Sequence, residues 1–220
     1  ITQASLLGHA GDIDGNTLTV TSVSVAAGQG TISGNSGGPW TFTPAANFNG
    51  VATLTFVTSD GTATVSQNAI VNVAAVNDAP VINSLPTLSV AEDNTLVINK
   101  ATLLAGVTDV DGNALSISNI SVNNSAQGTI VNNCDGTWSF TPAANFNGTA
   151  GLTFSVSDGT TTVNQSINVA VSAVNDAPIV SAVNMSMSED GSLSFTNAQL
   201  LASAGASDIE GSALSITSIT

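Results

Sequence analysis

The chain of 220 residues carries 15 acidic residues against a single Lys or Arg, which gives a formal net charge of −14. Because it offers no basic patch to phosphate groups, we expect no nucleic acid partner and no attraction to an anionic lipid surface. A hydrophobic fraction of 42% excludes a disordered chain. No apolar run approaches the roughly 20 residues of a membrane span, so we expect no direct membrane insertion. Cys134 is the single cysteine and predicts a fold without an internal disulfide.

The sequence repeats itself, which decides how it is divided into domains. The run Pro-Ala-Ala-Asn-Phe-Asn-Gly that begins at Pro44 returns at Pro142, 98 positions later. Val-Asn-Asp-Ala-Pro ends at Pro80 and again at Pro178, and its proline favours a linker because it interrupts both helix and central strand. The sequence therefore predicts a first repeat over 1–77 that lacks its N-terminal strands, a complete repeat over 78–175, and the N-terminal part of a third over 176–220.

Within the complete repeat, apolar residues alternate with Ser, Thr and Asn, which is the period of half-buried β-strands. The alternation covers 115–122, 138–141, 152–156 and 167–171, and Asp-Gly or Asn-Gly turn signals lie between these runs. The one helical signal is a single turn at 100–104, which recurs at 198–201. The predicted fold class is all-β, with tandem antiparallel β-sandwich domains of about 98 residues.

The acidic residues gather in motifs that recur along the chain, and only Asp135 lies outside them. Two carboxylates about 4 Å apart repel by roughly 4 kcal/mol at an effective dielectric of about 20, so such clusters without Lys or Arg favour a bound cation. Oxygen ligands without His or Cys favour Ca2+. The alternative is that the motifs only form turns, although turn formation does not explain the Glu-Asp pairs. The recurring acids are Asp12, Asp14, Asp109, Asp111, Asp208 and Glu210 in Asp-x-Asp-Gly-like motifs, Glu92, Asp93, Glu189 and Asp190 in Glu-Asp pairs, Asp60 and Asp158 in Ser-Asp-Gly turns, and Asp78 and Asp176 in the linkers.

The run 152–159, followed by alternating apolar residues and by the linker 174–178, resembles the closing half of a cadherin-type repeat, and 108–113 resembles its Asp-x-Asp motif. The chain is more similar still to the cadherin-like tandem repeats of very large bacterial surface adhesins exported by type I secretion, the RTX-adhesin-like extender domains. These repeats share the Pro-Ala-x-x-x-Asn-Gly and Asn-Asp-Ala-Pro signatures. The resemblance implies cadherin-like or Ig-like sandwiches, an extracellular or bacterial cell-surface location, and Ca2+ held between successive repeats.

The resemblance also implies which residues bind the ion. For the first junction the implied ligands are Asn77, Asp78, Asp109, Asp111 and Asp158, and acidic clustering alone adds Glu92 and Asp93. For the second junction they are Asn175, Asp176, Asp208 and Glu210, with Glu189 and Asp190 as the matching acidic pair. Asp12, Asp14 and Asp60 would serve a junction upstream of residue 1. The Leu-Asp-Arg-Glu motif of a true cadherin repeat is absent, so both one ion and three ions per junction stay open.

The leading hypothesis is a non-enzymatic structural extender of an adhesin, rigidified by Ca2+, whose partners are neighbouring repeats of the same polypeptide. Catalysis has little support, because His9 is the only histidine and its counterpart in the next repeat is Gly106. A second hypothesis is a module that binds a glycan or a protein through loops at one end. A third is a fibre subunit, in which the third repeat of one copy completes the first repeat of another by strand complementation.

Overall fold

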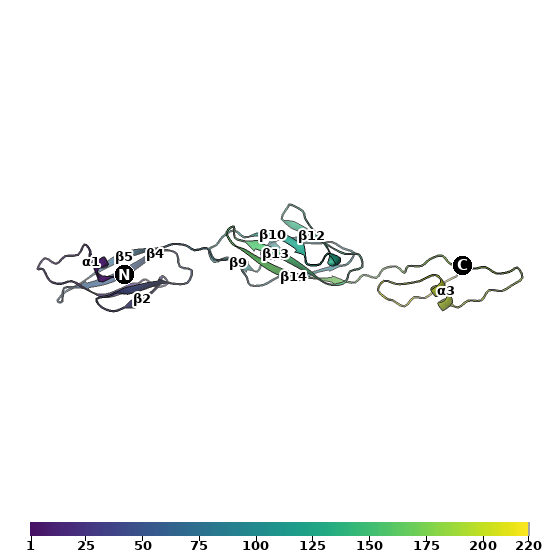
Figure 1. Ribbon diagram of the computed structural model, residues 1–220, viewed down its shortest axis with the longest axis horizontal. Helices are drawn as coiled ribbons and strands as arrows, with labels where there is room; N and C mark the ends of the chain where they lie inside the picture. Colours follow the sequence, from purple (N-terminus) through teal and green to yellow (C-terminus); the bar gives the residue numbers. More distant parts are fainter. Residues whose placement is uncertain (220) are drawn as a thin grey trace. The chain divides into compact units, whose positions relative to one another are not determined.

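The computed structural model describes residues 1–219 and divides the chain into two compact units. The first unit consists of Ile1–Asp78 together with Val110–Asn113, and the second begins at Ala79 and includes the remaining described residues. β-Strands predominate in both units, and the helices are short (Figure 1). The predicted all-β class is therefore confirmed.

The second unit contains the fuller sandwich. Its larger sheet has the order β10-β13-β14-β7, in which β7 runs parallel to β14 and the other pairs are antiparallel. A three-stranded sheet of order β11-β12-β8 supplies the second layer, and β6 pairs with β9. The elements are β6 (Val81–Ile82), β7 (Leu88–Ala91), β8 (Leu96–Asn99), α2 (Lys100–Leu104), β9 (Val107–Thr108), β10 (Ser116–Val122), η1 (Ser125–Gln127), β11 (Gly128–Asn132), β12 (Thr137–Pro142), β13 (Gly148–Ser157), β14 (Thr162–Ser172) and α3 (Asn197–Ser203).

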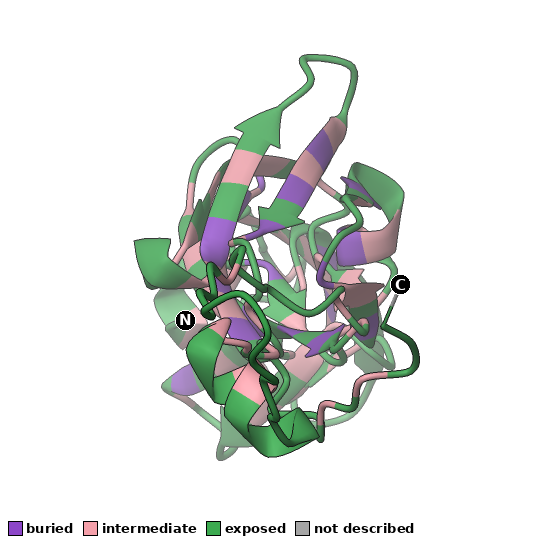
Figure 2. Ribbon diagram, turned by 90° about the vertical axis from the view of Figure 1, so that its right-hand side faces the viewer, coloured by how far each residue is buried: buried purple, intermediate pink, exposed green. Residues whose placement is uncertain are grey.

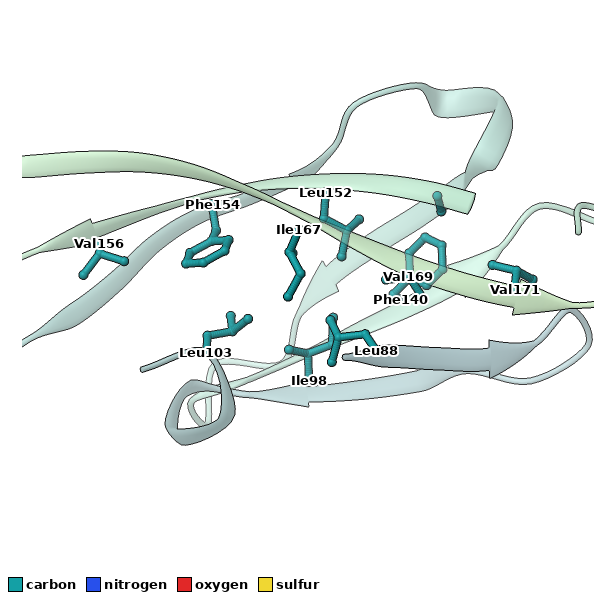
Figure 3. Close-up of a cluster of buried hydrophobic side chains, with 11 residues drawn as sticks. Leu88, Ile98, Leu103, Phe140, Leu152, Phe154, Val156, Ile167, Val169 and Val171 are labelled. Carbon is teal, nitrogen blue, oxygen red and sulfur yellow. The ribbon is translucent and has the colours of Figure 1, made fainter. Parts of the chain in front are cut away.

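Alternation of side chains along these strands builds the core between the two sheets. Leu152, Phe154 and Val156 on β13 all point inward and are fully buried, because every second residue of a strand faces the same side. Phe140 on β12 meets them from the opposite layer (Figure 3). Buried and exposed residues alternate in the same way along the strands of Figure 2. Trp138 is also buried, as its alternation with Phe140 predicts.

The first unit repeats this plan with fewer strands. Its elements are α1 (Gln3–Leu7), β1 (Thr19–Val25), β2 (Gly30–Gly34), β3 (Trp40–Pro44), β4 (Gly50–Ser59) and β5 (Thr64–Val73). One sheet has the order β1-β4-β5, and β2 pairs with β3. Its core contains Val20, Trp40 and Phe56.

The two predicted helical turns are present as α2 and α3, and each begins at a side-chain cap. Asn99 accepts from the amide of Thr102, and Thr196 accepts from the amide of Gln199, which satisfies amide groups that have no partner inside the helix. No described helix combines the length and the apolar character that a membrane crossing requires.

Candidate functional site

The first group of candidate ligands lies at the end of the first unit, where the linker after β5 contacts the Asp-x-Asp-Gly loop. The amide of Asp78 donates to Oδ2 of Asp111 at 2.7 Å. The side-chain amide of Asn113 donates to Oδ1 of Asn77 at 2.9 Å, and Asn77 in turn donates to the carbonyl of Asp78 at 3.0 Å. The structure therefore brings together three of the predicted residues, Asn77, Asp78 and Asp111.

A hollow of about 300 Å³ opens at this group. Asp78 and Asp111 line it together with Asn47 and Asn49, which belong to the Pro-Ala-Ala-Asn-Phe-Asn-Gly loop. The sequence did not predict that the asparagines of this loop share a hollow with the linker acid. Amide oxygens are suitable Ca2+ ligands, so these two side chains extend the set of oxygen donors.

The second group lies in the second unit and repeats the same clasp. The amide of Asp176 donates to Oε2 of Glu210 at 3.1 Å, and Asn175 donates to the carbonyl of Asp176 at 2.9 Å. Glu210 therefore occupies the role that Asp111 has in the first group. Oδ2 of Asp176 is buried and has no hydrogen-bond partner among the described residues.

Glu92 belongs with this second group and not with the first, where acidic clustering had placed it. Its carboxylate accepts from the amide of Val174 at 2.7 Å, directly before Asn175. The physical reason is the parallel pairing of β7 with β14, which brings the residue after β7 to the end of β14 from which the linker leaves. Glu92 is only 3% exposed, and its Oε2 has no hydrogen-bond partner in the described part of the chain.

Several of the remaining predicted acids shape their own turns. Oδ1 of Asp12 accepts from the amides of Asp14 and Asn16 at 2.9 and 3.0 Å, and Oδ1 of Asp208 accepts from Ser212 at 2.8 Å. In the Ser-Asp-Gly turns, Oδ1 of Asp60 and of Asp158 each accepts two backbone amides. These carboxylates therefore help to form the turns in which they lie. The hydrogen bonds to Asp12, Asp208 and Asp60 are accepted by Oδ1 of each side chain.

The amides of Ala63 and Thr62 also affect protonation, because they hold the pKa of Asp60 below its ordinary value. A carboxylate that accepts backbone N–H groups is stabilised in its charged form. The pKa of Asp135 is also lowered, first by the hydrogen bond from the side-chain hydroxyl of Thr137 and then by the bond from its backbone amide.

The other predicted ligands are placed as follows. Asp158 is buried and Asp109 is half-buried, both in the second unit, whereas Asp14, Asp93, Glu189 and Asp190 are exposed. Within residues 1–219, no three His, Cys, Asp or Glu side chains lie close enough together to form a metal cluster. Any cation at these groups would therefore depend also on amide or backbone oxygens and water, which Ca2+ accepts.

Comparison with known proteins identifies the class. The chain belongs to the cadherin-like domain family, which matches residues 1–74, 76–172 and 174–220. Domains of this family are extracellular, non-enzymatic adhesion modules that occur in tandem, can self-associate and typically bind Ca2+. No curated protein sequence matches the chain.

Three solved structures illustrate the likeness in fold. Form II of human protocadherin-24 EC1-2 is 18% identical, with 76% of this chain and 85% of that chain covered and a TM-score of 0.49. The endo-fucoidan hydrolase MfFcnA4 H294Q of glycoside hydrolase family 107 is 25% identical, with coverages of 73% and 24% and a TM-score of 0.31. Domains 1–6 of surface layer protein SbsC are 16% identical, with coverages of 74% and 21% and a TM-score of 0.32. The chain spans about a quarter of the length of the fucoidan hydrolase structure, and likenesses this weak carry no inference about activity.

Proposed function

We propose that the chain is a structural extender segment of a secreted or cell-surface bacterial adhesin, in which Ca2+ bound at the linkers stiffens the connection between successive repeats. The proposal keeps the division into repeats at 1–77, 78–175 and 176–220. It rests on membership of the cadherin-like family and on the acidic, oxygen-rich composition of the linker groups.

The proposal rests above all on the carboxylate of Glu92, which is buried and has one oxygen without a hydrogen-bond partner among the described residues. A buried, ionised oxygen without a hydrogen bond loses the solvation that it had in water, a cost of about 1–3 kcal/mol or more for a charged group. Oε2 of Glu92 and Oδ2 of Asp176 are both buried oxygens without a hydrogen-bond partner among the described residues. A divalent cation that accepts carboxylate oxygens would remove this cost, so the donor set fits Ca2+.

In the second group, Glu92, Asn175, Asp176, Asp208 and Glu210 would hold the ion, and in the first group Asn77, Asp78, Asp111 and the amides of Asn47 and Asn49. The bound ion would supply positive charge that cancels the repulsion among these carboxylates. The protein's own contribution is the clasp from the linker amide to the loop carboxylate, which orients the donors before any ion binds.

The energetic consequence is a coupling between binding and stability. Extracellular Ca2+ modules bind at about 10⁻⁴ to 10⁻³ M, so millimolar Ca2+ would occupy the groups and stabilise the folded state by mass action. Without the ion, the repulsion among the carboxylates of each group would remain uncompensated.

Thermal unfolding in millimolar Ca2+, in excess chelator and in Mg2+ tests the proposal. The account predicts a melting temperature raised by Ca2+ and much less by Mg2+, which dehydrates reluctantly and demands a stricter geometry. Glu92→Gln should reduce the Ca2+-dependent increase, whereas Asp135→Asn, at an exposed acid outside the recurring motifs, should leave it unchanged. Equal melting temperatures in all three conditions would mean that the acids serve only as turn residues.

A further inference from the structure

The first and last strands of the larger sheet in the second unit lie side by side and run in the same direction. β7 pairs with β14 in parallel, from Leu88 opposite Val169 to Ala91 opposite Ser172. The other strand pairs of that sheet are antiparallel. The chain enters the sheet at the start of β7 and leaves it at the end of β14. The entry strand and the exit strand are therefore bonded directly to each other.

This pairing determines how tension along the chain acts on the unit. A pull on the preceding residues draws Leu88 backwards along the strand axis, and a pull on the linker draws Ser172 forwards. Because the strands are parallel, the two forces slide β7 and β14 past each other and load all four register pairs at once. In an antiparallel pair joined by a turn, tension at the two open ends breaks the pairs one after another instead.

The side chains of β7 oppose such sliding. Leu88 is buried in the core between the two sheets (Figure 3), and the half-buried Val90 packs against the same core. Side chains of a strand point alternately to opposite faces, so a slip by one residue would turn this apolar pair toward water. A slip by two residues would restore their direction, but it would first break every bond of the ladder and would separate Glu92 from the linker.

Two hydrogen bonds of Glu92 extend the parallel ladder beyond its last register pair. The backbone amide of Glu92 donates to the carbonyl of Ser172 at 3.0 Å. Its carboxylate accepts from the amide of Val174 at 2.7 Å, and this bond lies on the linker side of β14. Glu92 is buried, and a hydrogen bond is stronger in such an environment than in water. The carboxylate therefore ties the exit of the unit to the turn that follows its entry strand.

The contacts that precede β7 are fewer. β6 makes only two register pairs with β9, and the amide of Asn83 donates to the carbonyl of Gly106 at 2.8 Å. Tension that enters from the preceding linker reaches β6 first. Once β6 has separated, the load passes to β7, which is held by its four register pairs and by Glu92.

We propose that β7, β14 and Glu92 form a mechanical clamp, which gives the second unit resistance to tension along the chain. This function goes beyond the stiffening by Ca2+ proposed above, because the clamp consists of bonds within the unit that form without an ion. Domains of the cadherin-like family occur in tandem, so a force on one module reaches the next through its chain ends. Forced unfolding is governed by the rate of unfolding, and the clamp lowers that rate for one direction of load.

The direction of pulling tests the clamp without a change in sequence. In single-molecule force spectroscopy with excess chelator, the chain is held by its two ends, or by its C-terminal end and the exposed thiol of Cys134. The second geometry pulls on Gly148 and Val171, which lie opposite each other at the open end of the β13 and β14 pair, and should unzip it. The second unit, identified by a released length of up to about 3.6 Å per residue, should unfold at a severalfold higher force in the first geometry. Equal forces in the two geometries overturn the proposal.

Two proline variants test the ladder within β7. Because the amides of a strand point alternately to opposite sides, the amide of Val90 faces β14 as that of Glu92 does, and the amide of Ser89 faces away. Val90→Pro removes an N–H from the clamp and should reduce the end-to-end unfolding force severalfold, whereas Ser89→Pro should preserve most of it. Equal forces in two folded variants contradict the clamp. If circular dichroism shows that Val90→Pro does not fold, the two pulling geometries of the unaltered chain remain decisive.

The role of Glu92 is tested in the same chelator. Glu92→Ala removes the acceptor of the Val174 amide, and Asp93→Ala removes an equal charge at the exposed neighbour. The first variant should unfold at a lower end-to-end force and the second at the force of the unaltered chain. Equal forces in the two variants contradict the part assigned to Glu92. A chain that binds Ca2+ but unfolds at the same force in both pulling geometries refutes the clamp alone, whereas a direction-dependent force without Ca2+ binding refutes only the proposed stiffening by the ion.

Discussion

The amide of Asp176 donates a hydrogen bond to the carboxylate of Glu210, 34 residues further along the chain. The same clasp joins Asp78 to Asp111 in the first group, although the acceptor there is one methylene shorter. In both groups, therefore, a linker amide donates to a carboxylate of the loop that follows the short helix. The two acceptors, Asp111 and Glu210, differ in type but have the same position in the repeat.

Removal of this clasp should loosen the linker. Asp111→Ala deletes the acceptor of the Asp78 amide, and a hydrogen bond of this kind contributes about 1 kcal/mol. The Asp78 amide should therefore exchange with solvent about fivefold faster. Asp14→Ala, at the counterpart residue of the first loop, provides the control and should leave the exchange of Asp78 unchanged. Unaltered exchange in both variants would show that the clasp does not restrain the linker.

The Ser-Asp-Gly turn should depend on pH. Because the amides of Ala63 and Thr62 lower the pKa of Asp60 in the folded state, the turn gains stability that is present above the unfolded pKa. This stability is lost as the pH falls through the folded pKa. In an NMR titration, the side chain of Asp60 should therefore have its midpoint below the ordinary value of 3.8. A midpoint at or above that value would contradict the geometry of the turn.

The two aromatic counterparts should differ in their contribution to stability. Phe140→Ala empties a fully buried position and should cost about 3–5 kcal/mol of unfolding free energy. Phe42→Ala alters a half-buried position and should cost about half as much. Urea unfolding of both variants compares the two losses. Equal losses would mean that the first unit is packed as fully as the second.

Gly106 should resist substitution because of packing. A Cβ at this position would meet the backbone carbonyl and the hydroxyl of Ser84, so Gly106→Ala should destabilise the second unit by about 1–3 kcal/mol. Gly11→Ala is the control, since no neighbouring atom lies within 4 Å of the added Cβ. Thermal unfolding of the two variants would contradict this account if both lost the same stability.

The strands could be predicted from the sequence because their signal is local. The alternation of Leu152, Phe154 and Val156 determines which side of β13 faces the core, and the two short helices follow from their own residues. The position of Glu92 could not be predicted in this way. It depends on the parallel pairing of β7 with β14, two segments that lie about 80 residues apart in the sequence. Neither segment contains a local signal that identifies the other as its pairing partner.

The hollow that Asn47 and Asn49 share with Asp78 was missed for a related reason. An Asn-Phe-Asn-Gly run marks a turn whether or not its side chains meet another loop. The link from Asn113 to Asn77 had a usable signal, because an asparagine also follows the first Asp-Ile-Asp-Gly motif, at Asn16.

Calorimetric titration of the protein with Ca2+ would show whether the acidic linker groups bind the ion. The account predicts saturable binding with a dissociation constant of about 10⁻⁴ to 10⁻³ M, weakened by Glu92→Gln and unaffected by Asp135→Asn. The absence of saturable binding in the intact protein, or equal binding by both variants, would contradict it.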